Sequence, residues 1–418
     1  MDFSSPLLAV EDAQRELLRH FGPLPTEFVP LAAALGRTLA TAVQADADMP
    51  PFANSAMDGY AVRAADLAQA SRTNAVPLRI IERVAAGAMP TLTVESGTAI
   101  RIMTGAPLPA GADAVVPFEE TSELHTPASA QTEHVQVYVA PVVGTNIRPA
   151  GEDMRTGDTV LEAGTVITPG IIGVLATVGA AQVAVYRRPR VAILATGDEL
   201  VDVNQKPGPG QIRNSNGYAN AAQVWAAGGE PIMLPIVRDN EAALLGAIDQ
   251  GLAAVADMFI TSGGVSVGDF DVVKQVLERE GKLAFWRVRM RPGKPLAFGH
   301  LRGVPLIGLP GNPASAMVCF ELFARPAIHT LQGRRSVFRP SVAATLVSGT
   351  IQATDRRQFL RVVVRATANG LTADLTGSQG SGLVTSMARA NGLLVVAEGT
   401  TTFEAGSVMP VLLLDAPE

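Results

Sequence analysis

This chain of 418 residues is poor in cysteine, histidine and aromatic residues, and each scarcity argues against a class of protein. Its one cysteine, Cys319, cannot form an internal disulfide, which suits a reducing cytosol. The five histidines are scattered without ligand spacing, so no zinc site is expected. Aromatic residues make up 5% of the chain and the net charge is -6, which argues against base stacking and against nucleic-acid binding.

Long apolar runs are also missing. The longest, over residues 171–186, is interrupted by glycine, threonine and glutamine, so it predicts a helix from Pro169 to about Gly179 and then a strand, and no membrane span. The first residues show no basic segment followed by an apolar one, so we expect no signal peptide and a cytoplasmic protein. Cys319 lies in a helical apolar pattern and is expected to be core filler.

The length predicts three or four domains, and the first part of the chain is expected to be discontinuous. Residues 1–185 would form an N-terminal region. Its helical or mixed domain (about 1–50 and 145–185, with helices over 9–21 and 31–43) would enclose a β-rich insert (about 51–144), because short β-type runs there alternate with turn residues.

The remaining two regions differ in their predicted secondary structure. Residues 186–335 alternate strands and helices, which predicts a central doubly wound, mostly parallel α/β sheet. Residues 336–418 return to strands and predict a small C-terminal β-barrel or sandwich. The fold class is therefore multidomain α/β plus β.

Three loops that follow strands of the α/β region combine glycine, hydroxyl and carboxylate side chains. They are residues 196–200 (TGDEL), 262–271 (SGGVSVGDFD) and 309–315 (LPGNPAS). Ligands of an open parallel sheet bind outside the carboxyl ends of its strands, so we expect these loops to lie on one edge. Glycine permits close approach of backbone N–H groups to a phosphate, whereas carboxylates there require a cation. The loops therefore predict a divalent metal held against a phosphorylated ligand.

Several charged residues are candidates at this edge. The loops bring four carboxylates to it, Asp198, Glu199, Asp269 and Asp271, of which Glu199 and Asp271 also match acidic positions of the family named below and are therefore the predicted metal ligands, and a fourth loop adds Asp239. Arg291 and Lys294, in a fifth loop, supply positive charge. Oxygen ligands suit Mg²⁺, and cations suit anionic oxygens, so this set indicates phosphate-ester or oxyanion transfer.

Each candidate also has a purely structural interpretation. Glu199 could belong to the first turn of a helix, Asp271 could cap one, and Arg291 and Lys294 could simply be solvated. The GNP segment could only start a helix, and Asp58 in NSAMDGYA reads by itself as part of a turn. The convergence of the loops on one edge favours function. No G-x-x-x-x-G-K-[ST] loop is present, nor a G-x-G-x-x-G after a strand.

Taken together, the motifs resemble the MoeA family of molybdopterin molybdenumtransferases, which includes the gephyrin E domain. The matching stretches run from end to end of the chain, and their order makes the match specific: NSAMDGYA (54–61), RIMTGAPLP (101–109), AGED (150–153), ATGDEL (195–200), SGGVSVGDFD (262–271), RPGKP (291–295), LPGNP (309–313), GSQGSG (377–382) and SMARANGL (386–393).

The resemblance implies the final step of molybdenum cofactor biosynthesis. In that step molybdenum from molybdate enters adenylylated molybdopterin, AMP is released, and Mg²⁺ assists. The resemblance also implies a homodimer of four-domain subunits with a composite active site. Possible partners are a molybdopterin adenylyltransferase and the receiving molybdoenzymes, with no nucleic acid and no membrane.

The resemblance extends to individual residues. The catalytic set that it implies is Asp58, Thr104, Asp153, Glu199, Asp239 and Asp271. Lys294, Ser315 and Arg361 match positions proposed to hold the oxyanion. The full substrate-binding set predicted from loops and resemblance is Ser262, Gly263, Gly264, Arg291, Lys294, Pro310, Asn312, Pro313, Ser315 and Arg361.

One position departs from the family, and two other functions remain as alternatives. Arg291 stands where the family commonly has lysine, and a planar guanidinium binds an oxyanion differently from a point charge. The adenylyltransferase of the preceding step shares the α/β domain type, and a gephyrin-like interaction scaffold shares the fold. The extra domains and the SGGVSVGDFD form favour molybdenum insertion over adenylylation.

Overall fold

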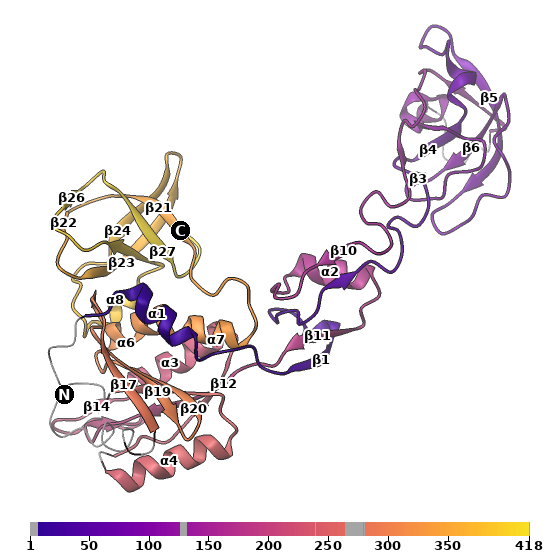
Figure 1. The fold of residues 1–418 in the computed structure, drawn as a ribbon. Helices are drawn as coiled ribbons and strands as arrows, with labels where there is room; N and C mark the ends of the chain where they lie inside the picture. Colours follow the sequence, from indigo (N-terminus) through magenta and orange to yellow (C-terminus); the bar gives the residue numbers. More distant parts are fainter. Residues whose placement is uncertain (1–6, 126–131, 239, 264–278, 280, 418) are drawn as a thin grey trace. The chain divides into compact units, whose positions relative to one another are not determined.

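The computed structural model describes residues 7–125, 132–238, 240–263, 279 and 281–417. The chain forms two compact units, which are described separately (Figure 1). Unit 1 comprises Met1–Thr41, Ala163–Pro169 and Gln182–Glu418, and unit 2 comprises Ala42–Glu162 and Gly170–Ala181.

Unit 1 contains the predicted α/β sheet, with strand order β15-β12-β16-β20-β19-β17. Its strands β15, β12, β16 and β20 are parallel to one another, β19 is antiparallel to β20, and β17 is antiparallel to β19 and so runs in the same direction as the first four. The central strands are almost continuously apolar because both of their faces are covered. The mostly parallel sheet is confirmed, and the helix expected after residue 272 falls outside the described residues. The strands are β12 (Arg190–Ala195), β15 (Glu230–Met233), β16 (Met258–Ser262), β17 (Gly281–Arg287), β19 (Pro295–Leu301) and β20 (Val304–Leu309).

Helices cover both faces of this sheet, as the alternation of side chains along a strand requires (Figure 1). Ala192 and Leu194 of β12 pack in the core with Leu244 and Ile248 of α4 (Glu241–Ala253). Val191 and Ile193 belong to the other core, which is built with the remaining helices of the domain. These are α1 (Val10–Leu18), α3 (Ser215–Ala226), α6 (Pro313–Cys319), the π-helical turn η5 (Phe320–Ala324) and α7 (Arg325–Leu331).

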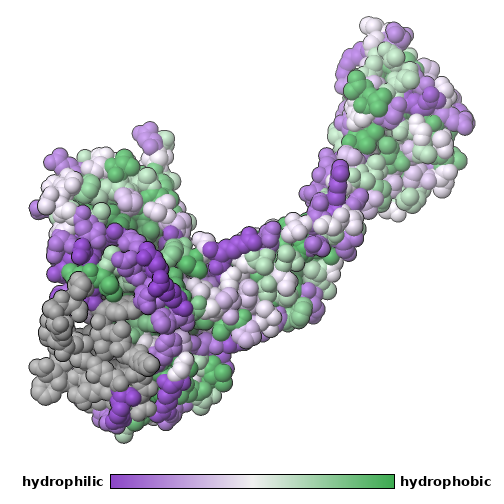
Figure 2. Space-filling view, viewed as in Figure 1, coloured by the Kyte–Doolittle hydropathy of each residue, from purple (hydrophilic) through white to green (hydrophobic). Residues whose placement is uncertain are grey.

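Helix α1 shows why its sequence joins this core. Val10, Ala13 and Leu17 recur at helical spacing and are buried. Glu11 and Asp12 lie in its first turn, where carboxylates stabilise the helix dipole, and the face that α1 turns outward is hydrophilic (Figure 2).

The helix predicted over residues 31–43 is wrong. Only a short 3₁₀ turn, η1 (Leu31–Ala33), forms, and Gly36 adopts a φ of 74°. The following backbone pairs with a distant segment, since Leu39 N donates to Thr165 O at 2.9 Å. This pairing overrides the helix propensity of the alanines and leucines.

The predictions for residues 169–186 are confirmed. Helix α2 (Pro169–Thr177) begins at the proline and ends before Gly179, which has a φ of 71°. Strand β11 (Gln182–Tyr186) then pairs antiparallel with β1 (Thr26–Pro30) in unit 1.

The C-terminal part of unit 1 is a closed barrel rather than an open one. Strand β23 pairs with both β24 and β25, and the ring continues through β27 and β21 back to β24. A short strand, β18 (Met290–Arg291), adds to β23. The barrel strands are β21 (Ser341–Leu346), β23 (Arg357–Thr367), β24 (Gly370–Leu375), β25 (Gly392–Val396) and β27 (Val408–Leu413), accompanied by the antiparallel pair of β22 (Thr350–Gln352) and β26 (Thr402–Glu404) and by helix α8 (Val384–Ala388).

Unit 2 is built on a five-stranded sheet with order β7-β4-β6-β5-β8, whose strands all lie within the region predicted to be β-rich (about 51–144). The unit also includes residues 145–162 and most of helix α2, which were predicted to belong to the helical or mixed domain. Tyr60, Val62, Leu78 and Val116 are buried on one of its faces, and Ile100 and Val115 belong to a second cluster. The strands are β4 (Gly59–Val62), β5 (Val76–Val84), β6 (Thr98–Ile102), β7 (Ala114–Pro117) and β8 (His134–Val137), with two small pairs, β3 (Asn54–Ser55) with β9 (Ile147–Arg148) and β2 (Val43–Gln44) with β10 (Thr159–Leu161). Within the described residues of the whole chain, every helix is too short or too polar to cross a bilayer.

A buried histidine in unit 1 predicts acid sensitivity. His329 of α7 is 2% exposed, and burial, followed by the charges of Arg334, Arg325 and Arg339, lowers its pKa to about 2. The unfolded chain binds a proton at His329 below about pH 6.5, whereas the folded chain does not. Stability contributed by this site is therefore complete above pH 6.5 and is lost as the pH falls, by up to about 1.4 kcal/mol per pH unit.

The replacement His329→Gln is expected to flatten this dependence. Between pH 7.5 and 5.5, the fall in the free energy of unfolding of unit 1 should shrink by about 1.4 kcal/mol relative to wild type, measured by denaturant titration. Equal slopes for His329→Gln and wild type would contradict the prediction.

Candidate active site

The carboxyl ends of three neighbouring strands meet at one edge of the unit 1 sheet. Ala195 at the end of β12 pairs with Ser262 at the end of β16, and Ser262 pairs with Leu309 at the end of β20. The three loops predicted to converge therefore start side by side.

These loops line a cavity of about 160 Å³ in unit 1. Five of the predicted site residues lie together in its lining: Glu199, Ser262, Gly263, Asn312 and Pro313. Further lining residues were not foreseen. They run from the end of strand β14 (Ile212–Arg213) into the first turn of helix α3: Arg213, Asn214, Ser215 and Asn216. A signal for them existed, because an Asn-Ser-Asn run before a helical pattern is a capping sequence, and Asn214 does accept from Gly217 N at 2.9 Å.

Glu199 is exposed to solvent and folds back over the loop that carries it. A Cβ at Gly197 would lie 2.2 Å from Glu199 Oε2, and Gly197 has a φ of 145°. Only glycine allows both the backbone conformation and this position of the carboxylate. Strand β13 (Leu200–Val201), which pairs in parallel with β14, then fixes the end of the loop.

The loop with Arg291 and Lys294 is anchored on helix α6. Gly293 has a φ of 101°, and a Cβ there would lie 2.4 Å from Cys319 Sγ. The Cys319 thiol is buried and lies 3.5 Å from Gly293 O, so it is core filler as predicted. Burial, then Arg287 and Arg356, lowers the pKa of Lys294.

Arg291 and Arg361 line a second cavity of unit 1, of about 480 Å³, beside the GSQGSG segment. Arg361 is 1% exposed. Its guanidinium donates to Gly380 O at 3.1 Å and to Ser386 Oγ at 3.2 Å, so it holds that segment in place. Arg291 is exposed.

The start of helix α6 contacts the GSQGSG segment. Ala314 N donates to Ser381 O at 3.0 Å, and the Asn312 side chain makes no capping hydrogen bond. Ser315 is 4% exposed and Pro310 is also buried, so both belong to the buried part of the 309–315 segment. Asp239, Gly264 and Asp271 lie outside the described residues.

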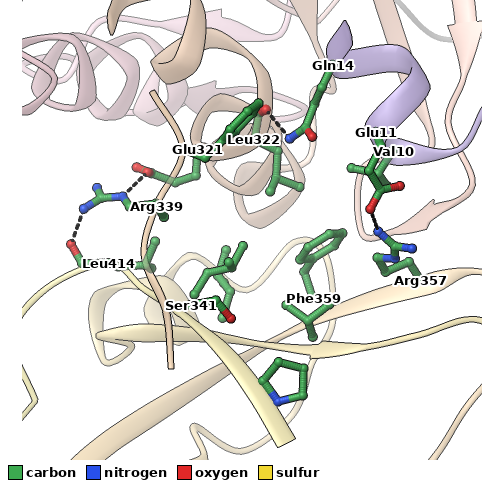
Figure 3. A pocket seen from close by; sticks show the side chains of 15 residues that line it. Val10, Glu11, Gln14, Glu321, Leu322, Arg339, Ser341, Arg357, Phe359 and Leu414 are labelled. Carbon is green, nitrogen blue, oxygen red and sulfur yellow. Dashed lines mark hydrogen bonds and ion pairs between the residues drawn. The ribbon is translucent and has the colours of Figure 1, made fainter. Parts of the chain in front are cut away.

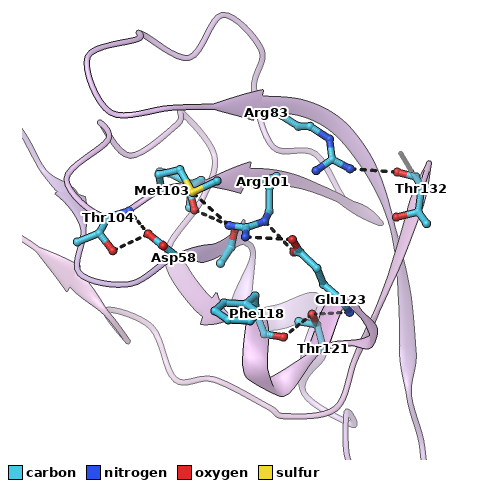
Figure 4. Close-up of polar contacts among 11 residues, drawn as sticks. Asp58, Arg83, Arg101, Met103, Thr104, Phe118, Thr121, Glu123 and Thr132 are labelled. Atoms are coloured by element: carbon cyan, nitrogen blue, oxygen red, sulfur yellow. Dashed lines mark hydrogen bonds and ion pairs between the residues drawn. The ribbon is translucent and has the colours of Figure 1, made fainter. Parts of the chain in front are cut away.

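Two of the predicted residues of unit 2, Asp58 and Thr104, are in contact (Figure 4). Asp58 Oδ1 accepts from Thr104 N and from Thr104 Oγ1, both at 2.7 Å. These two bonds, and then the charge of Arg101, lower the pKa of Asp58, so its carboxylate is ionised at neutral pH. The antiparallel pairing of Gly59 with Ile102 brings the two residues together. Asp153 is exposed and lines another cavity of unit 2, of about 450 Å³.

A further apolar cavity, of about 260 Å³, lies within unit 1 between α1 and the barrel (Figure 3). Leu322, Phe359 and Leu412 contribute to its lining, and no predicted site residue does. Its charged rim residues are paired, as Arg339 Nε with Glu321 Oε2 at 2.9 Å shows. In the part of the chain that the structure describes, no three histidine, cysteine, aspartate or glutamate side chains are grouped as a metal site.

Comparison with known proteins agrees with this architecture. Three family models match: the MoeA N-terminal region (domain I and II) over residues 8–179, a probable molybdopterin binding domain over 192–330, and the MoeA C-terminal region (domain IV) over 343–414. Among solved structures, the molybdopterin biosynthesis moeA protein of Pyrococcus horikoshii OT3 superposes with a TM-score of 0.82 at 28% identity, covering 98% of this chain and 100% of that one.

Curated relatives match over nearly the whole chain. A molybdopterin molybdenumtransferase of Bacillus subtilis is 37% identical over 408 residues, covering 97% of this chain and 94% of the relative. Molybdopterin molybdenumtransferase 2 of Mycobacterium tuberculosis is 38% identical over 412 residues, covering 96% and 98%. A third, from Staphylococcus epidermidis, is 34% identical over 412 residues, covering 98% and 96%. With its motifs, its sheet order and these full-length relatives in agreement, the chain belongs to the MoeA family.

Proposed function

We propose that the protein is a molybdopterin molybdenumtransferase. It inserts molybdenum from molybdate into adenylylated molybdopterin and releases AMP. The observation that carries the proposal is the cavity at the carboxyl ends of β12, β16 and β20, where Glu199, Ser262, Gly263 and Asn312 converge. Hydroxyl, amide and backbone groups next to a carboxylate suit a phosphorylated ligand accompanied by a cation.

The donor set of this cavity fits Mg²⁺. Glu199 provides a carboxylate, and Thr196 and Ser262 provide hydroxyl oxygens, whereas cysteine and histidine are absent from the described lining. Such hard oxygen ligands are those that Mg²⁺ prefers, and it commonly keeps several waters and shares phosphate oxygens with a nucleotide. Glu199, with Asp271, would hold the ion, which when bound offsets negative charge on the phosphates.

The remaining residues position the reactants. Ser262, Gly263 and Asn312 bind the phosphates of adenylylated molybdopterin, and Arg291 and Lys294 attract molybdate. An oxygen of molybdate or of water bonds to the phosphorus of the molybdopterin phosphate, the anhydride bond breaks, and its electron pair leaves with AMP.

The proposal includes assembly and location. We place Asp58, Thr104 and Asp153 in the same reaction, contributed by the second subunit of a homodimer with composite sites. Asp239, Gly264, Pro310, Pro313, Ser315 and Arg361 complete the site or support it. The single buried cysteine suits a cytosolic enzyme, and a molybdopterin adenylyltransferase and molybdoenzymes are its expected partners.

One assay separates this function from its rivals. The protein is incubated with adenylylated molybdopterin and Mg²⁺, with and without molybdate, and AMP and protein-bound molybdenum-pterin are measured. Molybdate-stimulated AMP release together with molybdenum incorporation is the expected result. A parallel incubation supplies ATP and bare molybdopterin instead, and formation of adenylylated molybdopterin there, without insertion in the first incubation, would identify an adenylyltransferase. Absence of both reactions would favour a scaffold.

A further inference from the structure

Behind the Asp58–Thr104 pair, unit 2 buries an arginine. Arg101 is 7% exposed and lies on β6, opposite Tyr60 of β4 in the antiparallel register. Arginine is rarely buried unless its charge is paired, and a lone buried charge is costly. Here Glu123 is the ion-pair partner. Its Oε1 accepts from Arg101 Nη2 at 3.1 Å, and its Oε2 lies 2.7 Å from Arg101 Nε.

The third nitrogen of the guanidinium, Nη1, binds the backbone close to Asp58 and close to Thr104 (Figure 4). Arg101 Nη1 donates to Gly59 O at 3.1 Å and to Ile102 O at 3.0 Å. Gly59 directly follows Asp58, and Ile102 lies two residues before Thr104. One planar group therefore bridges the strand ends from which the two side chains project.

Aromatic rings enclose the same guanidinium. Its carbon lies 5.3 Å from the ring centroid of Tyr60 and 5.8 Å from that of Phe118, within cation–π range. Phe118 N donates to Asp58 O at 3.1 Å, so a residue that packs on Arg101 also holds the main chain of Asp58. Glu123 is held in turn, because its N–H donates to Thr121 Oγ1 at 3.2 Å.

We propose that Arg101, with Glu123 as its counter-charge, is a positioning residue that fixes Asp58 and Thr104 as one ligand-binding unit. The inference rests on the proposed function, in which Asp58 and Thr104 contact the ligand. It assigns Arg101 no ligand contact, since its guanidinium is buried and is bound by Glu123 and by two backbone carbonyls of unit 2. The Coulombic effect of Arg101 on Asp58 acts in the same direction as the two Thr104 hydrogen bonds.

A double-mutant cycle on the full-length protein tests this role. Arg101→Met is expected to lower kcat/KM for molybdate-stimulated AMP release by about 30-fold, because displacements near 1 Å in a site cost this much. If Arg101 acts through Asp58, the same change in an Asp58→Asn background should cost less than about 3-fold, since coupled residues are not additive. Arg101→Lys should recover only part of the activity, because it restores the charge without the planar fork.

Arg72→Met is the matched control. It removes another arginine–glutamate pair of unit 2, with Glu120 at 3.2 Å, whose members are more exposed. It should keep wild-type kcat/KM. If Arg101→Met does not fold, as judged by thermal unfolding, Glu123→Gln takes its place in the cycle, and its loss must likewise disappear in the Asp58→Asn background.

The outcomes separate the inference from the proposed function. No AMP release by the wild-type protein refutes both. A normal rate for Asp58→Asn refutes the role of Asp58 and the inference with it. Two outcomes overturn the positioning role alone, when Asp58→Asn does lower the rate. In one, the losses in kcat/KM caused by Arg101→Met and Asp58→Asn multiply in the double variant. In the other, Arg72→Met lowers kcat/KM as much as Arg101→Met does.

Discussion

Alanine at position 59 is expected to destabilise unit 2 by about 3 kcal/mol and to abolish the Asp58-dependent reaction with it. The added Cβ would lie 2.0 Å from Val116 O and 2.8 Å from Val116 C. Both are backbone atoms of β7, which pairs with β4 through Gly59 and Pro117. A flexible side chain could move aside, but the backbone of β7 cannot do so without losing its hydrogen bonds to β4.

Gly173→Ala is the matched control within the same unit. Gly173 lies in helix α2, and a Cβ there would meet nothing within 4 Å. Alanine in a helix is more stable than glycine by about 0.5–1 kcal/mol, so this variant should unfold slightly later than wild type. The unfolding midpoints of both variants are measured by denaturant titration, with limited proteolysis of unit 2 as the readout. A Gly59→Ala protein that unfolds with the wild-type midpoint would show that β4 and β7 can separate at this point.

Glu199→Gln is expected to lower the rate of molybdenum insertion by about 100-fold at low Mg²⁺ and to raise the Mg²⁺ concentration for half-maximal rate by about 10-fold. The change removes one negative charge from the cavity and keeps the size of the side chain. Excess Mg²⁺ should therefore restore part of the rate. The measurement is AMP release as a function of Mg²⁺ concentration.

Two further variants sharpen this result. Glu230→Gln changes a carboxylate, 49% exposed, at the first residue of β15, which is the opposite edge of the sheet, and should leave the Mg²⁺ dependence unchanged. Gly197→Ala displaces the Glu199 carboxylate without changing any charge and should shift the Mg²⁺ dependence in the same direction as Glu199→Gln. Identical Mg²⁺ curves for wild type and Glu199→Gln would remove Glu199 from the metal site.

The shared edge of the α/β sheet was predictable because it depends on local patterns. Apolar runs gave β12, β16 and β20, and parallel strands place their carboxyl ends together whatever their order. The order itself, with β16 between β12 and β20, is what brings Ser262 next to both neighbours. Asn214 and Asn216 were not foreseen at the cavity, because an Asn-Ser-Asn run before a helical pattern also serves simply to cap the helix.

The features that the sequence did not predict depend on backbone pairing between segments that are far apart in the chain. Residues 31–43 have helical composition, yet their backbone is used by segments more than 100 residues away, and no local pattern contains that information. The Asp58–Thr104 contact has the same origin, since β4 and β6 are separated in sequence and joined only in the sheet. Family resemblance suggested that both residues were functional, but it did not reveal their hydrogen bonds or the arginine behind them.

The packing of Gly293 on Cys319 has a practical consequence. The thiol is fully buried, and burial raises its pKa, so alkylating reagents can reach it only when the layer between α6 and the 291–295 loop opens. Because the chain has no second cysteine, every labelled molecule records one such opening. The rate at which Cys319 is alkylated in the wild-type protein therefore measures how often the loop that bears Lys294 opens.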